Sequence, residues 1–111
     1  MSELHKELSR IEFEMRENSM THTPIENEMR FYEAVKRGDM DAARTLSTPL
    51  GGEGFGVLST DRLRNLKYHL VITVSFITRF CVEGGMERET AYNLSDLYIR
   101  KADPVSYTHL R

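Results

Sequence analysis

The residues with the strongest potential for metal binding or nucleophilic attack are four histidines and one cysteine. The histidines are His5, His22, His69 and His109. No two of them are four residues apart, and zinc sites usually combine four His or Cys ligands at short, paired spacings. Cys81 lies between Phe80 and Val82, a setting typical of a small buried hydrophobe. We therefore predict no metal site, and we interpret His69 as a packed or solvent-edge histidine.

A glycine-rich connection, Thr48–Ser59, raises the question of a phosphate-binding loop, because four glycines fall within positions 51–56. A phosphate loop needs Gly-Lys-Ser/Thr after it and a strand before it, and the dinucleotide loop needs a fixed glycine spacing. None of these features is present. We interpret the stretch as a flexible loop pinned by Leu50, Phe55 and Leu58.

The carboxylates are spread along predicted helices with basic residues three or four positions away. Examples are Asp96 with Arg100, and Glu33 with Lys36 or Arg37, which we interpret as solvated ion pairs. No nucleophile is found beside a candidate base. The sequence therefore predicts a protein that is not an enzyme and that carries no cofactor.

The charge balance argues against direct binding to nucleic acid. Fifteen Lys and Arg stand against 17 Asp and Glu, which gives a net charge of -2, whereas phosphate-binding surfaces are strongly basic. The start of the chain has no apolar signal segment, and the most apolar stretch, Leu70–Val82, is interrupted by polar residues. A single cysteine leaves no disulfide within the chain. We expect an intracellular location and no membrane partner.

The elements that must position these residues are all helical. Apolar residues recur at three- and four-residue spacings over about 3–16, 24–37, 40–47, 60–83 and 86–102. The fourth segment also alternates like a strand at Leu70, Ile72, Val74 and Phe76. No second strand exists to pair with it, and its apolar residues spread round most of a helix. The predicted fold is a small all-α bundle of four principal helices, with a loosely attached fifth helix at the N-terminus. The apolar helix at about 60–83 is the central one of the four.

Local capping signals set the expected helix boundaries. Thr23, Pro24 and Glu26 form a capping box with proline at the first helical position. Asp39 is expected to cap the third helix, and Thr60 or Ser59 the central one.

One long stretch adds a family resemblance. The sequence LRNLKYHLVITVSFITRFCVEGGMERETAYNLSDLYIRKAD, residues 63–103, with EMRFYEAVKRGD and GFGVLS upstream, resembles the region before the DNA-binding domain in a Firmicutes-type group of AraC-family transcriptional regulators. The resemblance covers about residues 24–103. It implies a cytoplasmic regulator in which this module serves sensing, dimerisation or linkage, and in which a small-molecule effector could bind. The apolar excess on the central or last helix predicts that the chain self-associates as a homodimer. In such regulators a domain with two helix-turn-helix units follows and contacts DNA. That domain is missing here, so no DNA-binding residue is assigned.

The resemblance and the helical pattern together divide the chain into three parts. Residues 1–22 form the charged N-terminal helix, and residues 23–103 form the helical regulatory domain. The last eight residues, PVSYTHLR (104–111), match one reading frame of a transposase-end sequencing adapter. We therefore expect them to be foreign to the protein.

Polar groups inside the resembling motifs are the candidates for effector or interface contacts. They are Asn65, Tyr68, Arg79, Tyr92 and Asp96. The alternative for these five is hydrogen bonding between helices. The alternative for the whole chain is a stand-alone helical protein-interaction module, because FYEAVKRGDMDAARTL has an ankyrin-like pattern. That pattern occurs once, whereas repeat folds need stacked copies.

Overall fold

The computed structural model describes residues 2–50, 52 and 54–110, with the side chains of 109 and 110 left aside. Within these residues the chain forms helices and no strand, so the predicted all-α fold is confirmed. The elements are α1 (Glu3–Glu17), α2 (Ile25–Arg37), α3 (Met40–Leu46), α4 (Arg62–Glu83), α5 (Arg88–Ala102) and a short 3-10 helix η1 (Tyr107–Leu110).

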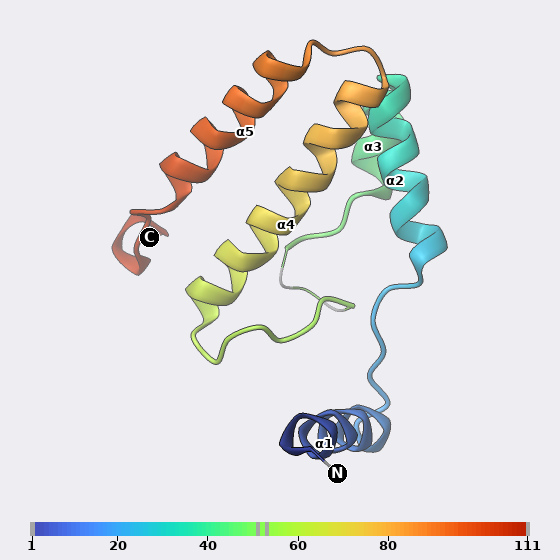
Figure 1. Cartoon of the computed structure of the whole chain (residues 1–111), viewed down its shortest axis with the longest axis vertical. Helices are drawn as coiled ribbons and strands as arrows, with labels where there is room; N and C mark the ends of the chain where they lie inside the picture. Colours follow the sequence, from blue (N-terminus) through green and yellow to red (C-terminus); the bar gives the residue numbers. More distant parts are fainter. Residues whose placement is uncertain (1, 51, 53, 111) are drawn as a thin grey trace.

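The long helix α4 lies at the centre of the fold, as its apolar circumference predicted. Figure 1 shows α5 running back along one side of α4, while α2 packs on another side and α3 packs against α2. The contact between α2 and α4 is aromatic. The Tyr32 ring stacks on Phe80 with centroids 5.2 Å apart and lies 5.5 Å from Phe76. Helix α1 stands apart from the other helices and contains no buried residue (Figure 1).

The core is small for a chain of this length. Among the described residues, the buried apolar side chains are Tyr32, Ala34, Ala43 and Ala91. Alanines at three of these sites let the helix backbones approach closely but remove little apolar area from water. The fold therefore leaves much of its apolar surface unburied.

Two of the predicted helix starts, those of α2 and α4, are wrong. Thr23 does not cap α2, because its backbone N–H donates to the Gly54 carbonyl (3.0 Å) in the glycine-rich loop. Pro24 takes the N-cap position without a side-chain bond. Helix α4 is capped by Asp61, whose carboxylate accepts from the Arg64 N–H (2.9 Å). The predicted cap at Asp39 is confirmed.

Solvated ion pairs along the helices form at two i,i+3 spacings, Lys6 with Glu3 (3.6 Å) and Arg44 with Asp41 (3.2 Å), but not at the two predicted examples. Asp96 makes no ion pair with Arg100, and Glu33 makes none with Lys36 or Arg37, among the pairs that join described residues. Arg37 instead lies 4.0 Å from Asp39, across the turn between α2 and α3. An exposed ion pair contributes little free energy, so small differences in local geometry decide which pair forms.

Candidate functional site

The first candidate surface is an apolar groove between α4 and α5, which we call the α4–α5 groove. It encloses about 340 Å³. Its walls are Leu70, Val74, Ile77, Thr78, Cys81, Met86, Ala91, Leu94, Ser95 and Tyr98. Leu94 is 41% exposed and Tyr98 is 58% exposed, so large apolar groups at the groove face solvent. Cys81 is half-buried here and forms no disulfide.

The second candidate is a cavity of about 530 Å³ between α2, α4 and the glycine-rich loop, which we call the α2–α4 cavity. Its apolar lining includes three phenylalanines, Phe31, Phe55 and Phe76, and its polar lining includes Tyr32, His69 and Thr73. The exposed side chains of Asn27 and Glu28 also line it.

The glycine-rich loop forms one wall of this cavity and is held from two sides. His69 is only 6% exposed, as expected for a packed histidine, and its Nε2 lies 2.6 Å from the Gly56 carbonyl oxygen. A carbonyl only accepts, so Nε2 carries the proton of this bond. The Phe55 ring meets the His69 ring edge-on at 5.0 Å. Contacts from α4 therefore hold the loop in place.

Two glycines of the loop, Gly54 and Gly56, are explained by close approach. A side chain at Gly54, where φ is 93°, would overlap the Thr23 hydroxyl, and a Cβ at Gly56 would lie 2.8 Å from His22 Nε2. Leu50 and Phe55 are half-buried, as the pinned-loop prediction requires. Leu58 is exposed and is held through its backbone instead.

The pKa of Tyr32, which lines the α2–α4 cavity, is raised above its ordinary value. Burial raises the pKa of its hydroxyl, and the nearby Glu28 carboxylate adds to the rise. A hydrogen bond with the Thr73 side chain acts in the opposite sense. The hydroxyl therefore stays protonated well above neutral pH and can donate.

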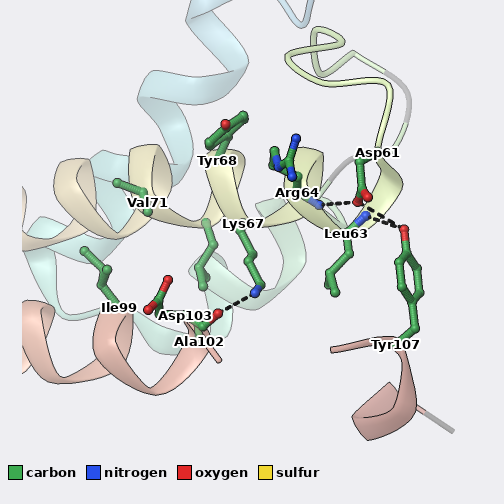
Figure 2. Close-up of a pocket in the computed structure, with 11 residues that line it drawn as sticks. Asp61, Leu63, Arg64, Lys67, Tyr68, Val71, Ile99, Ala102, Asp103 and Tyr107 are labelled. Carbon is green, nitrogen blue, oxygen red and sulfur yellow. Dashed lines mark hydrogen bonds between the residues drawn. The ribbon is translucent and has the colours of Figure 1, made fainter. Parts of the chain in front are cut away.

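A third cavity, of about 440 Å³, lies at the start of α4 and is drawn in Figure 2. The Tyr107 hydroxyl accepts from the Leu63 N–H (2.9 Å) and donates to the Asp61 carboxylate (3.2 Å). Lys67 Nζ donates to the Asp103 carbonyl (2.5 Å). The pKa of Asp61 is lowered, first by the backbone N–H of Arg64. Tyr107 belongs to the tail that we expect to be foreign to the protein.

The five candidate residues from the sequence do not converge on one site. Asn65 Oδ1 accepts the Leu58 N–H (2.7 Å), which fastens the end of the loop to α4. Tyr68 projects from α4 away from the Lys67–Asp103 bond in Figure 2. The Arg79 guanidinium sits 5.7 Å from the centre of the Tyr92 ring, which joins α4 to α5. Asp96 is exposed and makes no bond that links it to the others.

The α2–α4 cavity was missed by motif analysis. Its lining residues come from three separate segments, and no short motif spans them. The available signal was the placement of Tyr32, Phe76 and Phe80 on apolar helix faces, which indicated packing but not a cavity beside it.

Neither a metal centre nor a membrane segment is found in the described part of the chain. No group of three or more His, Cys, Asp or Glu side chains there is arranged to hold a metal ion. None of its helices combines the length and apolar character needed to cross a bilayer. Comparison with known proteins gives no significant match to a family model, to a curated protein or to a solved structure.

Proposed function

We propose that this chain is the regulatory portion of an AraC-family transcriptional regulator, acting in the cytoplasm as a homodimer. Its contact with DNA would be made only through a C-terminal helix-turn-helix domain outside this chain. The proposal starts from the sequence resemblance over residues 63–103, which form α4 and α5. It assigns no catalytic role.

The observation that supports self-association best is the excess of exposed surface. The chain has a mass of 12.9 kDa, and a folded monomer of that mass exposes about 6,300 Å². This chain exposes 8778 Å². Its radius of gyration is 16.4 Å, against about 13 Å for a compact domain of this length. Part of this excess of about 2,500 Å² belongs to α1, and an interface of standard size would remove about 800 Å² of the rest from each copy.

The α4–α5 groove is the part of that surface suited to a second copy. Met86, Leu94 and Tyr98 are exposed on it, and exposed apolar groups that lie together mark interaction sites more often than scattered ones do. An aromatic ring beside aliphatic side chains is also the usual composition of an interface centre. We therefore assign the dimer contact to this groove.

Sedimentation equilibrium of the full chain tests the dimer. We expect twice the mass of one chain for the wild type. Leu94→Glu places a charge in the groove and should give monomers, because a buried unpaired carboxylate is costly. Asn93→Glu makes a matched change at the neighbouring exposed position, which lies outside the groove, and should leave the dimer intact. A wild-type chain that stays monomeric at high concentration would contradict the assignment.

Sequencing an intact genomic copy tests the regulator itself. We expect the reading frame to continue beyond codon 103 into a segment with two helix-turn-helix patterns. A stop codon directly after codon 103 would instead support the second candidate, a stand-alone interaction module. The antiparallel α2–α3 hairpin favours that candidate, because Gly38 ends α2 at φ 73° and Asp39 caps α3, as in a helical repeat unit.

A further inference from the structure

We infer that the α2–α4 cavity is a binding site for a small planar aromatic molecule with an uncharged polar group, such as a phenol or an indole. The inference deepens the sensing role of the proposed regulator and rests on that function for its biological purpose. The site lies on α4 and α2, and its lining shares no residue with the α4–α5 groove.

The size and the walls of the cavity suit an aromatic ligand. A volume of about 530 Å³ falls within the usual range for small-molecule sites, about 300–1,000 Å³. Phe31, Phe55 and Phe76 line it from three different segments. Phe76 contacts Tyr32 and is still 46% exposed, so part of its ring is free for a further contact. Aromatic rings prefer offset-stacked or edge-to-face partners, which a planar ligand provides.

The polar groups of the cavity select an uncharged substituent. Tyr32 and His69 are both more than nine-tenths buried, and Thr73 offers a hydroxyl beside Tyr32. His69 Nε2 is already bonded to Gly56, and Tyr32 and Thr73 bond to each other, but each hydroxyl oxygen has a second lone pair. A ligand hydroxyl or ring N–H can donate to these lone pairs without bringing a full charge out of water. Glu28 and Arg30 both line the cavity, so their opposite charges favour neither an anion nor a cation.

A ligand bound in the cavity would change how α2, the glycine-rich loop and α4 are held together. The glycine-rich loop reaches α4 through His69 and reaches the segment before α2 through the Thr23 N–H. A ligand that contacts Phe31, Phe55 and Phe76 together would tie α2, the loop and α4 into one unit. Binding would then favour the arrangement in which α2 is docked on α4.

Titration of the full chain with indole and with p-cresol, followed by amide NMR, tests the site. We expect saturable shifts at residues that line the cavity, with Kd below about 1 mM, as small fragments allow. Ile72→Trp fills the cavity from α4 and should weaken indole binding about tenfold or more. Val71→Trp makes the same change at the next position, which is also exposed but lies outside the cavity, and should bind as the wild type does.

A second variant guards against a folding defect in Ile72→Trp. Thr73→Val keeps the shape of the side chain and removes its hydroxyl, so it should weaken p-cresol more than toluene. Absence of saturable binding by the wild-type chain would overturn the inference. Equal binding by both tryptophan variants would overturn it too, because the probes would then sit elsewhere.

These results can be separated from the test of the proposed function. Leu94→Glu should still bind indole as a monomer, because Leu94 lies outside the cavity. A chain that dimerises but binds no probe would refute only the ligand site. A chain that binds indole while its gene stops after codon 103 would refute only the regulator.

Discussion

Replacing Gly84 by alanine should loosen the contact between α2 and the end of α4. Gly84 has φ -78° and ψ -3°, a conformation open to any residue. In free space the change would stabilise the fold by about 0.4–1 kcal/mol, because alanine has less backbone freedom in the unfolded chain. The added Cβ would, however, overlap the Lys36 carbonyl oxygen and lie 3.2 Å from its carbon.

The size of the effect follows from what must move. A carbonyl at the end of a helix cannot rotate away as a flexible side chain would, so α2 has to shift by about 1 Å to restore ordinary contact. Overpacking of this kind costs typically 1–3 kcal/mol. After the gain from the stiffer unfolded chain is subtracted, we expect a net loss of about 1 kcal/mol in the free energy of unfolding, together with a weaker Tyr32–Phe80 stack.

Urea unfolding followed by circular dichroism measures this loss, and NMR of the Tyr32 ring reports the shift of α2. Gly85→Ala is the matched control, because a Cβ there meets no atom within 4 Å and the cost comes only from its φ of 115°. That variant should lose about 1–2 kcal/mol of backbone strain without moving the Tyr32 signals. If Gly84→Ala were as stable as the wild type, or more stable, the close approach of α2 to the end of α4 would be refuted.

Three further changes test single contacts. Asn65→Ala should lower the free energy of unfolding by about 1–2 kcal/mol in urea, because the Leu58 N–H loses its acceptor. Asn65→Asp keeps an acceptor and should lower the free energy of unfolding by less. Equal losses in the two variants would contradict this role of Asn65. The folded pKa of Glu87 lies below 4.5, first because the backbone N–H three residues on donates to its carboxylate. The stabilisation is complete above the pKa that Glu87 has in the unfolded chain, and it is lost as pH falls through the pKa in the folded chain. Glu87→Gln should therefore make the melting temperature depend less on pH in the acid range. An unchanged pH dependence would refute this role of Glu87. Arg79→Gln should lose about 0.5–1 kcal/mol of cation–π energy with Tyr92, whereas Arg79→Lys keeps the cation and should lose less in the same unfolding assay.

The fold could be predicted from the sequence because its elements are defined by local periodicity. The stretch that forms α4 is long and apolar, and without a partner strand its alternating residues could only be helical. The errors lie at helix starts, where a contact from a distant segment decides. The Thr23 backbone binds Gly54, more than thirty residues away, and no capping rule includes such a partner.

The candidate site could not be predicted in the same way. All five candidate residues are polar groups on α4 and α5, but they lie in separate structural settings, as the Asn65 and Arg79 contacts show. The cavity depends on how far Phe31 and Phe55 stand from α4, and that distance is set by backbone contacts such as the His69–Gly56 bond. A sequence pattern records which residues are apolar but not the space left between them.

The two proposed surfaces share α4, and this shared helix makes their coupling testable. One side of α4 carries Ile72, Thr73 and Phe76 in the cavity, and another carries Leu70, Val74 and Ile77 in the groove. If a ligand on the first side alters how α4 presents the second, the dimer and the Leu94→Glu monomer must bind indole with different affinity. Thermodynamic linkage then requires that indole change the dimerisation constant by the ratio of these two affinities for each site that it occupies. Equal affinities in dimer and monomer would mean that α4 carries two independent sites, and the sensing role would need another route to the DNA-binding domain.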